Sequence, residues 1–135
     1  MKRKIFISFD YDNDADIKGC LVSQIQDPSL PLEIIDMSIN KPIDEKWREE
    51  ARRRIAKCDV VIVLCGEHTK DAPGVTAELT IARELKIPYI LLKGRKKKVQ
   101  KPNSSLKEDL IYDWKWKKLI EILIGGKKHG KERYS

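Results

Sequence analysis

Apolar residues in this chain alternate between short β-branched or aromatic runs and longer stretches with helical spacing. The short runs predict four buried strands and a short edge strand, at residues 4–9, 32–37, 59–64, 88–92 and about 110–112. The helical spacing predicts four helices, which contain the apolar residues of positions 17–25, 43–55, 74–86 and 114–124. This alternation is typical of an α/β fold with a parallel sheet and helices on both faces.

One residue of the predicted helix at 74–86 does not fit its surroundings. At about 100° per residue, Glu78 falls inside the apolar sector, between Ala82 and Leu85. Glu84 of the same helix falls on the opposite side, where a solvent-facing charge is expected. A carboxylate against a core costs several kcal/mol unless it is paired or lines a cavity.

Two interpretations of Glu78 follow from the pattern. The helix comes after the third strand, and the start of such a helix borders the crevice where open parallel sheets bind ligands. Glu78 would then be a carboxylate that lines a pocket. Alternatively, it bonds to a backbone amide or to an arginine of a neighbouring helix.

A lone carboxylate suits one kind of glycosidic chemistry. Ordinary glycoside hydrolysis uses two carboxyl groups, one of which protonates the leaving group. The nicotinamide of NAD is already cationic and departs neutral, so it requires no acid. A single glutamate could stabilise the developing ribosyl cation and orient the ribose hydroxyls.

Several segments in a fixed order carry a family resemblance. The first is Phe6-Ile7-Ser8-Phe9 with the acidic loop that follows, and the second is residues 55–64. The third begins at residues 66–69 and continues through Val75 and Glu78, and it is followed by Ala82 and Ile87-Pro88. Over roughly residues 4–124, the chain resembles TIR (Toll/interleukin-1 receptor) domains. It is most similar to short microbial TIR-like proteins, which include the signalling component of the Thoeris antiphage system.

The resemblance implies a flavodoxin-like sheet of four to five strands in the order 2-1-3-4-5. It also implies cleavage of NAD at the nicotinamide–ribose bond, sometimes with formation of a cyclic or modified ADP-ribose messenger that reaches an effector protein. NAD would be the substrate and no cofactor is expected. Self-association is expected too, since TIR-like active sites are often completed by a neighbouring chain.

The family's functional residues map onto seven positions. Glu78 corresponds to the catalytic glutamate. Ser8, Phe9 and Asp10 correspond to the loop that borders the nucleotide, and His68, Thr69 and Gly74 to the opposite wall. Val75 departs from the pattern, because the family often has tryptophan at this position before the glutamate.

Two other functions stay open. Non-catalytic TIR domains share the fold and act by assembly or nucleotide binding alone. A nucleoside deoxyribosyltransferase-like enzyme also uses a helix-borne glutamate, and Asp71, Gly74 and Glu78 fit that pattern loosely. A response-regulator receiver is excluded because the third strand ends in Leu64-Cys65-Gly66, without a phosphoaccepting aspartate. The chain also lacks a P-loop and a G-x-G-x-x-G dinucleotide motif.

Charge is distributed unevenly. Residues 93–135 carry 14 Lys and Arg against 5 Asp and Glu, whereas residues 1–92 carry 14 against 16. The excess lies in a basic loop at 93–101 and a tail at 127–133, either of which could hold a phosphate-bearing ligand or nucleic acid. Nucleic acid is not favoured, because no aromatic residues interleave these lysines.

Composition completes the expectations. The three cysteines have no C-x-x-C spacing, so reduced, buried thiols are expected rather than disulfides or zinc. The aspartates at 12, 14 and 16 suit no particular ion; one of them is expected to cap the first helix, and no bound metal is expected. The chain shows neither a secretion signal nor an apolar run long enough for a membrane, which predicts a cytoplasmic protein. We expect one domain at residues 1–124 and a flexible basic tail at 125–135.

Overall fold

Five parallel strands form one sheet in the order β2-β1-β3-β4-β5. The computed structural model describes residues 2–38 and 43–125. The strands are β1 (Arg3–Ser8), β2 (Leu32–Met37), β3 (Val60–Cys65), β4 (Tyr89–Lys93) and β5 (Ile111–Tyr112). This order and direction give the flavodoxin-like α/β fold predicted from the sequence.

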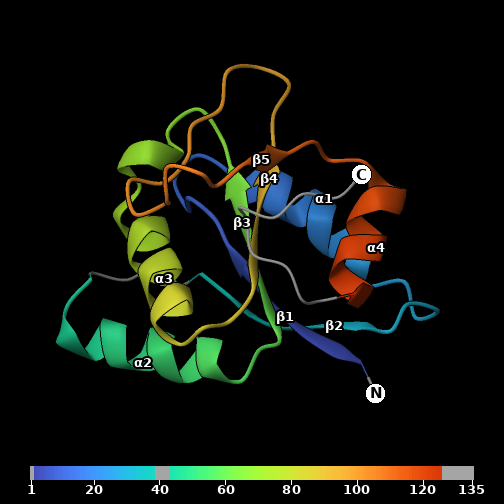
Figure 1. Cartoon of the computed structure of the whole chain (residues 1–135), viewed down its shortest axis with the longest axis horizontal. Coiled ribbons are helices and arrows are strands. Elements are labelled where there is room, and N and C mark those ends of the chain that lie inside the picture. The colour runs from blue at the N-terminus through green and yellow to red at the C-terminus, as the bar shows by residue number, and fades with distance from the viewer. Residues whose placement is uncertain (1, 39–42, 126–135) are drawn as a thin grey trace.

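Helices cover both faces of the sheet (Figure 1). They are α1 (Ala15–Ile25), α2 (Glu45–Ala56), α3 (Pro73–Glu84) and α4 (Trp116–Gly125), with a short 3-10 turn, η1 (Thr69–Asp71), before α3. Helices α2 and α3 pack on one face, and α1 and α4 pack on the other. The result is a three-layer arrangement with two apolar interfaces.

Alternate strand residues supply the two interfaces. In β3, Val61 and Val63 face α2 and α3, whereas Ile62 and Leu64 face α1 and α4. All six β3 residues are buried. A strand covered on both faces needs apolar residues at every position, which explains why residues 59–64 read as a continuous apolar run.

The predicted elements are confirmed, with boundaries that differ by one or two residues. The β1 strand begins and ends one residue earlier than predicted, and β3 one residue later. Among the described residues, no helix is long and apolar enough to cross a membrane. The tail expected at 125–135 lies, from residue 126 onward, outside the part of the chain that the structure describes.

Two local expectations were wrong. Asp14 occupies the N-cap position of α1, but its side chain makes no capping hydrogen bond and instead pairs with Arg95. Cys20 is exposed, since it lies beside rather than within the apolar stripe of α1, whereas Cys58 and Cys65 are buried as expected. Burial raises the pKa of each of these two thiols to about 12.

Candidate functional site

Glu78 is buried at the carboxyl edge of the sheet, where two serine hydroxyls donate hydrogen bonds to it. Ser8 Oγ lies 2.7 Å from Glu78 Oε1, and Ser38 Oγ lies 2.5 Å from the same oxygen. Glu78 is 1% exposed. No described residue donates a hydrogen bond to Oε2.

The topology brings these three residues together. Ser8 ends β1, Ser38 directly follows β2, and Glu78 lies on α3, the helix after β3. The chain runs from β1 to one side of the sheet and later to the other side, so a switch point lies between β1 and β3. Crevices outside the carboxyl ends of strands at such a point are the usual ligand sites of open α/β sheets.

Backbone contacts fix Ser38 in place. Its N–H donates to the carbonyl of Ile7 at 3.0 Å, and its Oγ accepts from the N–H of Phe9 at 3.0 Å. Because the hydroxyl accepts from Phe9, its own proton points to Glu78. The Ser38 hydroxyl is therefore a directed donor to the glutamate.

Burial controls the charge of Glu78. Loss of hydration raises its pKa from 4.5 to about 7. The hydrogen bonds from Ser38 and Ser8 oppose this shift because they stabilise the ionised form, and the charge of Asp36 adds to the rise. Glu78 is thus divided between its ionised and neutral forms near neutral pH.

These contacts differ from the structural alternative drawn from the sequence. Glu78 makes no hydrogen bond to a backbone amide or to an arginine among the described residues. The glutamate that does pair with a neighbouring helix is Glu84, which contacts Arg52 of α2 at the surface. The helical periodicity therefore separated the buried glutamate from the exposed one correctly.

Phe9 and Asp10 lie next to the site without touching Glu78. Phe9 points its ring into the opposite interface, where it stacks on Tyr11, and meets the site only through its N–H. The Asp10 carboxylate accepts from the Asp12 backbone and from the Asn13 side chain, which holds the loop after β1 in a tight turn.

The residues expected on the opposite wall are more scattered. Thr69 is buried and its Oγ1 accepts from the N–H of Gly66 at 2.7 Å, which closes the turn after β3. His68 is exposed at the start of η1. Gly74 lies in the first turn of α3, near Ile43. None of these three forms a hydrogen bond with Glu78.

Ser38 is the functional candidate that sequence reasoning missed. A signal existed, since Ser38 is the first polar residue after β2, and β2 neighbours β1 in the predicted strand order. A serine after a strand is common enough that this signal alone would not select it. The pairing with Glu78 depends on the register of β1, β2 and α3, which the sequence does not specify.

A second buried carboxylate, Asp14, anchors the loops of this edge. Its Oδ1 pairs with Arg95 Nε at 3.2 Å, and Arg95 also binds Asp16 at 2.8 Å. Asp14 sits directly against Gly66, where a Cβ would approach Oδ1 to 2.4 Å. Burial raises the pKa of Asp14, although its pairing with Arg95 lowers it. This contact joins the loops after β1, β3 and β4.

The site offers a carboxylate and two hydroxyls as its chemistry. The described residues include no group of three or more His, Cys, Asp or Glu placed to hold a metal ion. Glu78 contributes to none of the three surface cavities described among residues 2–38 and 43–125. A single buried carboxylate can stabilise a cation or orient hydroxyl groups.

Comparison with known proteins gives one family. The sequence model of the family described as "Thoeris protein ThsB, TIR-like domain" matches residues 6–99, which include Ser8, Ser38 and Glu78. No curated protein matches the chain. Among solved structures, the Trypanosoma brucei CTPS glutaminase domain with bound acivicin has a TM-score of 0.47 and 18% identity. That match covers 70% of this chain and 37% of the other chain.

Proposed function

The chain belongs to the family of the Thoeris protein ThsB, TIR-like domain, and from this membership we propose that it processes NAD as a signalling enzyme. Membership makes it a TIR-like signalling domain of a defence system. The proposed reaction is cleavage of the nicotinamide–ribose N-glycosidic bond. The ADP-ribose part would leave as a free, cyclic or otherwise modified product that acts as a messenger to an effector protein in antiphage defence.

The observation that carries the proposal is the carboxylate of Glu78 held by two hydroxyls at the carboxyl edge of the sheet. Two donors on Oε1 fix the orientation of the carboxylate, and Oε2 would face a substrate once the groups that cover Glu78 move. A buried carboxylate that structure alone requires is normally paired with a cation or with backbone amides. Glu78 has neither partner among the described residues.

The residues support a dissociative cleavage. As the C–N bond of the ribosyl nicotinamide breaks, its electron pair leaves with nicotinamide, and positive charge develops on the ribose. Ionised Glu78 stabilises that charge in a site that excludes water, where an electrostatic contact is stronger than in bulk solvent. Hydrogen bonds from Ser8 and Ser38 favour the ionised form and hold the carboxylate in place. Water or a nucleophile of the substrate itself then completes the product.

A non-catalytic role is the second candidate, and the burial of Glu78 favours it. Since Glu78 is 1% exposed, a substrate reaches its carboxylate only if neighbouring groups move. A domain that acts by assembly would need no such movement. Val75, at the position where the family often has tryptophan, points in the same direction.

The proposal is tested by incubation of concentrated protein with NAD and, in parallel, with a purine deoxyribonucleoside. Chromatography follows the release of nicotinamide and of the free base. Nicotinamide release alone supports NAD processing, whereas release of the purine base alone supports a deoxyribosyltransferase-like enzyme. Release of neither, across a range of protein concentrations, contradicts catalysis and favours the assembly role.

A further inference from the structure

Two adjoining cavities lie on the α1 and α4 side of the sheet, one between α4 and the strands β4 and β5 and the other between the end of β4, α1 and the segment before α4. The first, which we call the apolar cavity, has a volume of about 210 Å³, and the second, the cationic cavity, about 510 Å³. Asp113 and Lys115 line both. The floor of the apolar cavity, Ile90 and Leu92, belongs to the interface with α1 and α4, whereas Glu78 belongs to the other face. The sheet therefore separates these cavities from the candidate active site.

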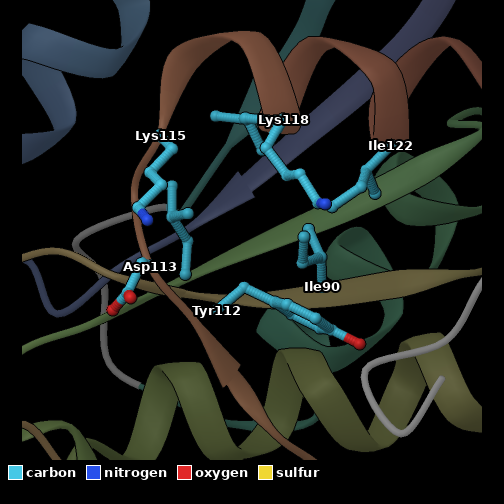
Figure 2. A pocket seen from close by; sticks show the side chains of 8 residues that line it. Ile90, Tyr112, Asp113, Lys115, Lys118 and Ile122 are labelled. Carbon is cyan, nitrogen blue, oxygen red and sulfur yellow. The ribbon is translucent and has the colours of Figure 1, made fainter. Parts of the chain in front are cut away.

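The apolar cavity has the walls that a flat ring requires. Figure 2 shows Tyr112 and Ile90 on the strand side, and Ile122 and Lys118 on the helix side. Asp113 and Lys115 lie together at one end. An aromatic ring that enters this cavity would exchange water for contacts with apolar and aromatic side chains.

The cationic cavity collects four positive side chains at the end of β4. They are Lys93, Arg95, Lys96 and Lys115. Among the described residues, none of the three lysines forms an ion pair, although the carboxylate of Asp113 lines the same cavity. Arg95 is fixed by its two aspartate partners, which holds the start of the basic loop in place. Since Asp14 and Asp16 already pair with Arg95, the three lysines are the cations left to bind a phosphoryl group.

Trp114 adds an aromatic surface to these cations. It lines the cationic cavity, and its Nε1 donates to Gln24 Oε1 of α1 at 2.9 Å, which fixes the ring. The sequence alone argued against nucleic acid here, because no aromatic residue interleaves the lysines of the basic loop, and left a phosphate-bearing ligand open. The fold supplies the aromatic residue from a segment about twenty positions later in the chain.

The order of chemical groups across the two cavities matches that of a nucleotide. An apolar slot is followed by the exposed carboxylate of Asp113, and then by the lysines. A base, the hydroxyls of a ribose and a phosphate would meet these groups in turn, since carboxylates commonly accept from ribose hydroxyls. We propose that the two cavities form a second nucleotide site, separate from Glu78, which takes a nucleoside phosphate. This site does not depend on whether the chain cleaves NAD.

Titration calorimetry with ADP tests the proposal. Wild-type protein and the Glu78→Gln variant are expected to bind ADP with the same affinity. The Lys93→Gln/Lys115→Gln double variant is expected to bind at least about tenfold more weakly, because it loses two charge-assisted contacts. Lys117→Gln is the matched control, since Lys117 is an exposed lysine of α4 that lines neither cavity.

A second binding experiment separates the contribution of the ribose from that of the phosphates. Asp113→Asn is expected to weaken ADP about tenfold but not to weaken inorganic pyrophosphate, which has no ribose and would meet one negative charge fewer in the cationic cavity. Equal ADP affinity of the wild type and the lysine double variant would overturn the proposal. So would the absence of ADP binding while single-stranded RNA or anionic lipid vesicles bind through the same lysines.

Discussion

Ser38 donates a 2.5 Å hydrogen bond to Glu78 Oε1 across 40 positions of sequence. The same hydroxyl accepts from the N–H of Phe9, so its proton has one direction in which to point. Ser8 approaches the same oxygen from β1. The carboxylate is therefore oriented by Ser8 at the end of β1 and by Ser38 directly after β2, beside the switch point between β1 and β3.

Removal of the Ser38 hydroxyl should change the pH dependence of catalysis. Ionised Glu78 is the active form, so nicotinamide release should rise with pH around the pKa of about 7. Ser38→Ala removes a donor that favours the ionised form, and we expect its rate profile to shift upward by about one pH unit. The shift would appear in rates measured from about pH 5.5 to about 9, in buffers that differ by about half a pH unit. Ser23→Ala is the control, because Ser23 is exposed on α1 and bonds only to the Gly19 carbonyl. A purely structural Ser38 would lower the rate equally at every pH.

Ionised Glu78 should also lower the free energy of unfolding at neutral and alkaline pH. Its pKa in the folded protein, about 7, lies above its ordinary value of 4.5, so the folded state holds the proton more tightly than the unfolded state. The contribution of protonated Glu78 to the free energy of unfolding is complete below pH 4.5 and disappears as the pH rises through about 7. Above that range, Glu78→Gln should be more stable than the wild type by up to roughly 3 kcal/mol, and the difference should shrink on acidification.

Urea unfolding at several pH values measures this difference. Glu84→Gln is the matched control, since Glu84 lies on the same helix and is exposed; its effect should stay within about 0.5 kcal/mol. A Glu78→Gln variant that is less stable than the wild type at pH 8 would show that the carboxylate contributes to folding rather than to function.

The contact between Gly66 and Asp14 predicts that replacement of this glycine by alanine destabilises the protein. In Gly66→Ala, the new Cβ would meet the Asp14 carboxylate at 2.4 Å, and we expect a loss of about 1–3 kcal/mol in the free energy of unfolding. Gly19→Ala is the control, because a Cβ there meets nothing within 4 Å, and alanine stabilises a helix interior by about 0.5–1 kcal/mol. In an Asp14→Ala background the clash partner is absent, so the effect of Gly66→Ala should largely vanish. If Gly66→Ala lowers the free energy of unfolding by the same amount in the Asp14→Ala background, the strain does not come from the contact with Asp14.

Sequence reasoning recovered the strands and helices because periodicity reports burial directly, whereas the strand order followed from the family resemblance. The continuous apolar run of β3 and the misplaced charge at Glu78 are both consequences of packing against the sheet. Sequence reasoning was wrong where a side chain can bond to more than one partner. Asp14 is a good capping residue by type, yet it pairs with Arg95, which lies 81 positions away.

The site was recovered in part for the same reason. Glu78 is visible from its own helix, whereas Ser38 becomes a candidate only when the register of β1, β2 and α3 is known. Trp114 likewise meets the basic loop only in the folded chain. Family resemblance assigned Ser8 to the loop that borders the nucleotide, and the structure places Ser8 against Glu78; the resemblance gave no indication of Ser38.

The most direct measurement is nicotinamide release from NAD by the wild type, Glu78→Gln and Glu84→Gln at matched, high protein concentration. We expect release by the wild type and by Glu84→Gln, and a loss of at least about 100-fold in Glu78→Gln, as removal of a group that stabilises the transition state typically produces. Thermal unfolding of all three would confirm that they are folded. Release by Glu78→Gln at the wild-type rate would contradict the assignment of Glu78 as the catalytic carboxylate.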